Sequence, residues 1–250
     1  MAELTWDVWV VIALGLAAGG LTKGITGLGL PGVAVPVMAS FLGVEHAVMI
    51  MLFPTLITNG WLVWRLRDCY REVPELRRVV LMGFPGVGVG AAILYLASDQ
   101  FLATVLSVWI FAYLALRFFR PELRLSPQAR RRFAFPVGFA SGTLQGSTGI
   151  CAPVIVPYVD ALGISPRTYV FTFAAVFMSL SFSHLSILWI ARAYPLEQLM
   201  ESLLAVIPAM IFVPIGSWLR KYLPSSIFGR MIRVFLFVMA IRLFYTAWIS

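Results

Sequence analysis

The stretch that decides the fold is Gly20-Leu21-Thr22-Lys23-Gly24-Ile25-Thr26-Gly27-Leu28-Gly29-Leu30-Pro31. It recurs later, without gaps, as Gly142-Thr143-Leu144-Gln145-Gly146-Ser147-Thr148-Gly149-Ile150-Cys151-Ala152-Pro153. The identical positions are Gly20, Gly24, Thr26, Gly27 and Pro31, which return as Gly142, Gly146, Thr148, Gly149 and Pro153. Two copies of one glycine-rich stretch, each near the start of one half of the chain, indicate an internal repeat.

The residues around both copies are strongly apolar. Of the 250 residues, 60% are hydrophobic and 12% are charged, whereas soluble domains carry about a quarter charged residues. This composition predicts a polytopic membrane protein and excludes a soluble enzyme, a nucleic-acid-binding module, a secreted disulfide scaffold and a disordered chain. The ten apolar segments are Trp6–Leu21, Leu28–Leu42, His46–Trp64, Val79–Ala97, Phe101–Phe119, Phe133–Leu144, Ile150–Leu162, Arg167–Ile190, Ser202–Leu219 and Met231–Ile249.

The basic residues predict the orientation of these segments. Fifteen of the 19 lie in or beside three connections, at 65–78, 117–132 and 220–233. Short loops rich in Lys and Arg stay in the cytoplasm, so we expect these three connections inside. The remaining connections are acidic or nearly uncharged, and we predict that they lie on the outer side of the membrane. Both chain termini are then expected outside.

The first two segments of each half are short. Trp6–Leu21 is about 24 Å long as a helix and Leu28–Leu42 about 22 Å, against a hydrocarbon core of about 30 Å. We therefore expect a helical hairpin that turns inside the membrane, with its turn at residues 22–29. Phe133–Leu144 and Ile150–Leu162 form the matching pair, with a turn at 143–151. The alternative is two pairs of short helices that do span.

The resulting fold class is an all-α integral membrane protein made of two inverted-topology repeats. Repeat 1 covers residues 1–119 and repeat 2 residues 120–250, each a short re-entrant or broken hairpin followed by three transmembrane helices. The first half begins outside and ends inside, and the second does the reverse. Repeats of this kind place the substrate near the bilayer midplane, between discontinuous helices.

Both turns have the chemistry of an anion site. A helix that begins after a turn offers backbone N–H groups and the positive end of its dipole, and glycine lets a ligand approach the backbone closely. The alternative is that the glycines only permit close helix packing. The predicted substrate-binding residues are Lys23, Gly24, Thr26, Gly27, Gln145, Gly146, Ser147, Thr148, Gly149 and Cys151.

Lys23 is the leading candidate because it is the only basic residue among the first 60. An ionisable group inside a membrane indicates function, and Lys23 can also give up its proton and so couple transport to protons. The alternative is a lysine that extends to the cytoplasmic boundary. Its counterpart Gln145 is uncharged. Asn59 and His184, in the third segment of each half, are candidates for coupling or gating, with helix packing as the alternative.

The paired turns, Gly-Leu-Thr-Lys-Gly-Ile-Thr-Gly-Leu-Gly at 20–29 and Gly-Thr-Leu-Gln-Gly-Ser-Thr-Gly at 142–149, resemble those of the TauE/SafE sulfite exporter family. The length and the two-half layout are similar over essentially the whole chain. The resemblance implies a multi-pass secondary transporter of the bacterial-type inner membrane. Its substrate would be sulfite, a sulfonate or a related organosulfur anion. We expect no catalytic residue, metal, cofactor or nucleic acid, and leave a homodimer open.

Two other functions compete with this interpretation. An anion channel could use the same paired turns as a filter, and single-channel currents would identify it. An intramembrane enzyme acting on lipid head groups would need a nucleophile or a metal set at one leaflet, and the sequence offers neither.

Overall fold

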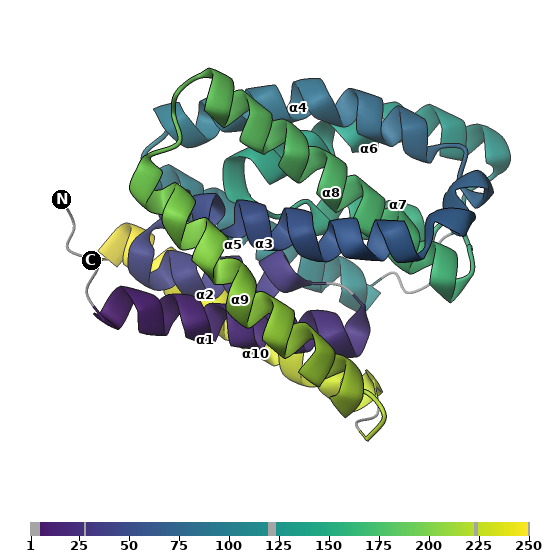
Figure 1. The fold of residues 1–250 in the computed structure, drawn as a ribbon. Helices are drawn as coiled ribbons and strands as arrows, with labels where there is room; N and C mark the ends of the chain where they lie inside the picture. The colour runs from purple at the N-terminus through teal and green to yellow at the C-terminus, as the bar shows by residue number, and fades with distance from the viewer. Residues whose placement is uncertain (1–5, 28, 120–123, 223–224, 250) are drawn as a thin grey trace. The chain divides into compact units, whose positions relative to one another are not determined.

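The computed structural model describes residues 6–27, 29–119, 124–222 and 225–249. The predictions for Leu28, Arg120 and the two chain ends concern residues outside these ranges. The described residues form ten α-helices and one 3-10 helix, with no strand. In order they are α1 (Trp6–Thr26), α2 (Leu30–Leu42), α3 (Val44–Arg65), η1 (Arg67–Glu72), α4 (Leu76–Leu96), α5 (Asp99–Phe119), α6 (Pro127–Thr148), α7 (Ala152–Asp160), α8 (Pro166–Ile190), α9 (Leu196–Leu219) and α10 (Ser225–Ile249) (Figure 1).

The second helix of each hairpin is short, in contrast to the other described α-helices. Five of those, α1, α3, α4, α8 and α9, are both long and apolar enough to cross a membrane. The second hairpin helices are much shorter: α2 has 13 residues and α7 has 9, which correspond to about 20 Å and about 14 Å. Both are too short to cross a hydrocarbon core of about 30 Å.

Helix α1 continues through Thr26, so the predicted turn at 22–29 is wrong in its first five residues. Thr22 and Thr26 donate their hydroxyls to the carbonyls of Ala18 and Thr22, at 2.7 and 2.8 Å, and remain helical. The chain reverses only over residues 27–29, where Gly27 has φ 83° and Gly29 φ 96°. Positive φ is accessible to glycine at little cost, which places the turn at these two residues.

The second turn is displaced in the same way. Helix α6 runs through Thr148, whose hydroxyl donates to Leu144 O at 2.8 Å, so the predicted turn at 143–151 is wrong for residues 143–148. Gly149, with φ 70°, ends the helix. Helix α6 also begins earlier than predicted because the Ser126 hydroxyl accepts a hydrogen bond from Ala129 N and caps it.

The chain folds into two compact units, and neither coincides with a sequence half. Unit 1 contains Met1–Pro54, Ala97–Leu114 and Pro195–Ser250, and unit 2 contains Thr55–Leu96 and Ala115–Tyr194. In unit 1 the largest interface joins α1 to α9, and in unit 2 it joins α4 to α6 (Figure 1). The first hairpin helix of each half therefore packs on the fourth helix of the other half.

Glycines of the repeated stretch form both interfaces at equivalent places. A Cβ added at Gly24 would lie 2.2 Å from Val213 O, and one added at Gly146 would lie 2.5 Å from Val87 O. Only a residue without a side chain allows backbones to approach this closely. Contacts advance in the same direction along both partners, from Gly20 near Phe212 to Gly24 near Gly216, so α1 and α9 run parallel. Helices α4 and α6 also run parallel.

Acidic connections meet at one end of unit 1. His46 Nε2, in the first turn of α3, lies 2.5 Å from Glu201 Oε2 in α9. Val44 N, also at the start of α3, donates to Asp99 Oδ1 at the start of α5, at 3.2 Å. Helices α3, α5 and α9 therefore begin at the same end of this unit. The charge pattern assigns these three helix starts to one side of the membrane.

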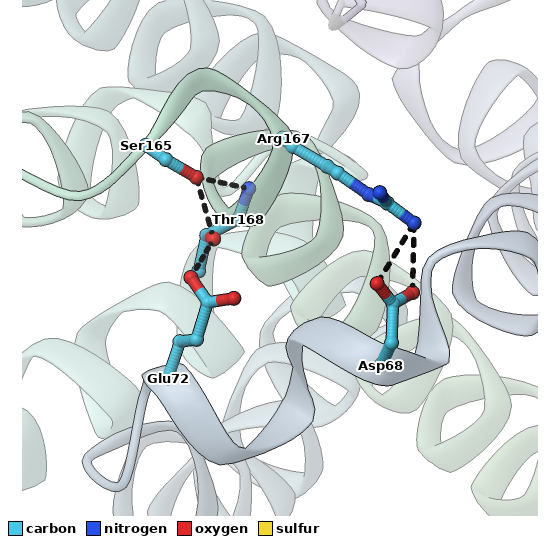
Figure 2. Close-up of polar contacts among 5 residues, drawn as sticks. All are labelled: Asp68, Glu72, Ser165, Arg167 and Thr168. Carbon is cyan, nitrogen blue, oxygen red and sulfur yellow. Dashed lines mark hydrogen bonds and ion pairs between the residues drawn. The ribbon is translucent and has the colours of Figure 1, made fainter.

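Basic connections meet at one end of unit 2. There η1 holds the start of α8: Arg167 bridges to Asp68 at 2.8 Å, and Thr168 Oγ1 donates to Glu72 (Figure 2). Ser165 Oγ accepts from Thr168 N at 3.2 Å and caps α8. The Arg78 guanidinium, near the start of α4, lies over the ring of Phe135 in α6. The starts of α4, α6 and α8 thus share one end.

Candidate functional site

Lys23 lies in the last turn of α1 and is only 4% exposed. Its side chain is therefore buried rather than extended to the surface. The carbonyl of Lys23 accepts the Gly27 N–H at 2.7 Å and closes the helix. A cation in this position also balances the negative end of the α1 dipole. This electrostatic stabilisation of the helix end is compatible with a second role toward an anion.

The helix start that follows Lys23 has the features of an anion site. Gly29 is the N-cap of α2, has no side chain to cap the helix, and is followed by Leu30 and Pro31. The first N–H groups of an α-helix have no partner within the helix, and here a cation lies in the preceding helical turn. Only residues 27–29 separate the end of α1, whose last turn contains Lys23, from the start of α2.

The second copy repeats this arrangement without the cation. Gln145 replaces Lys23 in the last turn of α6 and is 2% exposed. Cys151 is the N-cap of α7 and makes no side-chain cap hydrogen bond, and Pro153 follows at the second helical position. Cys151 is fully buried. Each copy of the repeat therefore gathers its own predicted residues where one helix ends and the next begins.

The predicted hydroxyl donors bond to their own helices. Thr26, Ser147 and Thr148 each donate to the carbonyl four residues back, at 2.8 Å. Ser147 and Thr148 are buried, whereas Thr26 is exposed. A hydroxyl can rotate to a new acceptor, so these side chains can serve an anion only by giving up a bond within the helix.

Gly24 and Gly146 were predicted as substrate-binding residues, and the structure places both against neighbouring helix backbones. In the fold, Gly24 and Gly146 permit close packing of helices, which was the alternative to substrate binding considered from the sequence. Gly27 and Gly149 do lie in the turns, with positive φ. The glycines of each repeat thus divide into a packing set and a turn set.

The two residues predicted for coupling or gating differ in their surroundings. Asn59 donates its side-chain N–H to Thr55 O, in its own helix, at 2.8 Å. His184 is fully buried, and neither ring nitrogen has a hydrogen-bond partner among the described residues. A buried polar group without a partner is costly, which makes His184 the more unusual of the two.

Sequence reasoning missed several polar contacts. Ser202, in α9, donates to Ile50 O at 2.8 Å and accepts from Phe53 N at 3.2 Å, both in α3. His46 and Glu201 pair close by. The partners are about 150 residues apart, and no local pattern marks them. Ser141, one turn before Gln145 on α6, is fully buried, and its hydroxyl has no hydrogen-bond partner in the part of the chain that the structure describes. Its spacing of four residues from Gln145 was the signal that could have identified it.

The five described helices that are long and apolar enough to cross a membrane define a multi-pass membrane protein. The family described as sulfite exporter TauE/SafE matches residues 11–243. The chain belongs to this family of membrane transporters for sulfur anions, as the paired glycine-rich turns had indicated. Searches of curated proteins and of solved structures gave no match.

Proposed function

We propose that this protein is a secondary transporter that carries sulfite, a sulfonate or a related organosulfur anion across the bacterial-type inner membrane. The anion is bound near the bilayer midplane by the two glycine-rich turns, each presenting a helix N-terminus. The main support is Lys23: this buried lysine in the last turn of α1, the helix that precedes α2, combines a positive charge with the dipole donors of the α2 N-terminus.

Helix lengths support a site at depth. If α2 and α7 end at opposite faces of the bilayer, their lengths place the turns about 20 Å and about 14 Å from those faces. Both values lie near the middle of a core of about 30 Å. That one anion is bound by both turns is a hypothesis from the sequence repeat.

The contacts within each unit support the inverted repeat. The interface of α1 with α9 and that of α6 with α4 use equivalent glycines, and both helix pairs are parallel. In each pair, one helix comes from each half of the sequence. Two halves of opposite topology account for this exchange, because the first helix of one half then runs in the same direction as the fourth helix of the other.

Replacement of Lys23 tests the site. Lys23→Ala and Lys23→Gln should each weaken sulfite binding by about 1.5–3 kcal/mol, because a charge-assisted hydrogen bond is lost. That corresponds to roughly tenfold to a hundredfold in Kd. Lys221 is the only other lysine and is exposed, so Lys221→Ala is the matched control. Folded Lys23→Gln protein that binds sulfite as tightly as the parent would remove Lys23 from the site.

Transport assays in proteoliposomes test the mode of action. Labelled sulfite and simple sulfonates should move at carrier rates, and an imposed pH gradient should change the rate if transport is coupled to protons through Lys23 or His184. Single-channel currents across a planar bilayer would instead identify the anion channel and exclude alternating access.

A further inference from the structure

Buried polar side chains lie where α6 and α8 pack together in unit 2. Gln145 is 2% exposed, and its Nε2 lies 3.5 Å from Ser181 Oγ. Ser181 is fully buried. His184 lies one turn further along α8, three residues on, and therefore on the same face as Ser181. These residues form a single cluster, named here the α6–α8 polar cluster: Gln145, Ser181 and His184.

The α6–α8 polar cluster has more hydrogen-bonding groups than the described residues pair. Gln145 Oε1 and both ring nitrogens of His184 are buried without a partner among them. Each such group destabilises the folded protein when it is left unpaired away from water. A packed helix interface would be more stable with apolar side chains of similar size. A bound ligand that carries both a donor and acceptors would offset this loss of stability, because it would pair with buried groups that otherwise have no partner.

We infer that the α6–α8 polar cluster is part of the substrate site and binds oxygen atoms of the sulfur oxyanion. This inference rests on the proposed transport function and adds Ser181 and His184 to its ligands. The imidazole has at least one N–H to donate in either protonation state. The Gln145 NH₂ group has a second N–H besides the one directed at Ser181 Oγ, and Ser181 has a hydroxyl hydrogen. All three are donors suited to sulfite or sulfonate oxygens.

The chemistry of the cluster also predicts what kind of oxyanion fits. The cluster has no charged side chain, so it binds through neutral donors. A neutral imidazole presents one donor and one acceptor. The two ring nitrogens point apart, so one anion faces only one of them. Hydrogen sulfite carries one O–H and can therefore donate to an acceptor, such as that nitrogen or Gln145 Oε1, while its other oxygens accept, whereas methanesulfonate supplies acceptors alone. We therefore expect His184 to matter more for sulfite than for methanesulfonate.

His184→Leu separates a ligand role from a structural one. If the imidazole serves to bind the substrate and does not stabilise the fold, the apolar variant should melt at the same temperature as the parent or higher. The reason is that the substitution removes an unpaired buried polar group. It should bind sulfite roughly tenfold more weakly. Ser181→Ala should lose several-fold in affinity. Ser186→Ala is the matched control, because Ser186 donates to Phe182 O in its own helix.

Binding of sulfite and methanesulfonate is measured by calorimetry on purified protein, with melting temperature recorded for every variant. Parent protein that binds neither anion would overturn the proposed function and this inference together. Parent protein that binds sulfite while folded His184→Leu and Ser181→Ala bind equally tightly would overturn the inference alone. If His184→Leu does not fold, His184→Gln, which keeps a donor and an acceptor, should retain more affinity than Ser181→Ala, and the reverse order would also overturn it.

Discussion

The hydroxyl of Ser202 in α9 donates a 2.8 Å hydrogen bond to the carbonyl oxygen of Ile50 in α3. Four residues after Ile50 comes Pro54, which lacks the N–H that would normally bond to this carbonyl. Ser202 therefore supplies, from another helix, the donor that proline removes from α3. This contact joins two helices of unit 1 at the point where α3 is weakest.

Ser202→Ala should consequently destabilise the protein by about 1–3 kcal/mol, since it leaves the Ile50 carbonyl without this donor. In a Pro54→Ala background the restored N–H should bond to Ile50, and the same substitution should cost much less. Unfolding of the four proteins in detergent gives the double-mutant cycle. Equal costs of Ser202→Ala in the two backgrounds would contradict the compensation.

Gly24→Ala and Gly146→Ala should each destabilise the fold by at least about 1–3 kcal/mol, the usual cost of overpacking. The reason is that the added Cβ would meet helix backbone at 2.2 and 2.5 Å, and backbone cannot move aside cheaply. Thermal unfolding followed by tryptophan fluorescence measures the loss. The control is Gly32→Ala in α2, where nothing lies within 4 Å of an added Cβ, so stability should be unchanged or raised by up to about 1 kcal/mol. Equal effects at Gly24 and Gly32 would argue against the packing role.

Sidedness is tested with single cysteines in a variant lacking Cys69 and Cys151. Gln100→Cys, next to Asp99, should react with a membrane-impermeant thiol reagent from outside, and Gln128→Cys should react only after the cytoplasmic face is opened. Both positions are exposed, and neither replaces Asp99 or Ser126, whose side chains bond to a helix start. Labelling of position 128 from outside, without position 100, would reverse the proposed orientation.

The two contacts between η1 and the start of α8 should differ in strength. The Arg167 and Asp68 side chains are 61% and 59% exposed, so Asp68→Asn should cost between about 0 and 1 kcal/mol and less still in high salt. Ser165→Ala removes the α8 cap (Figure 2) and should cost about 1 kcal/mol at any salt concentration. Melting temperatures at low and high salt distinguish the two. A salt-dependent effect at Ser165 would contradict this account of the cap.

Much of the fold could be predicted because its signals are local. Apolar runs longer than a helical turn mark the helices, and all ten predicted segments overlap a helix in the described residues. The turns were recognised from repeated glycines, yet their first residues were misplaced. Glycine and threonine are weak helix formers in isolation, but Gly24 and Gly146 are needed for packing and the threonine hydroxyls bond back to their own helix.

For the candidate site, too, some features follow from the sequence and others only from the tertiary structure. The sequence by itself determined the class of protein and the repeated glycine-rich stretch, and it led to the proposal of Lys23 and Gln145 as site residues, because charge, composition and a duplicated motif are properties of the chain. Only the tertiary structure decided that α1 packs on α9 and α4 on α6, that Ser202 donates to the carbonyl that faces Pro54, and that His184 is buried with no hydrogen-bond partner among the described residues. Which helices pack together depends on small residues that allow two backbones to approach closely. The residues that contact each other lie in segments far apart in the chain, so a local sequence pattern does not reveal them.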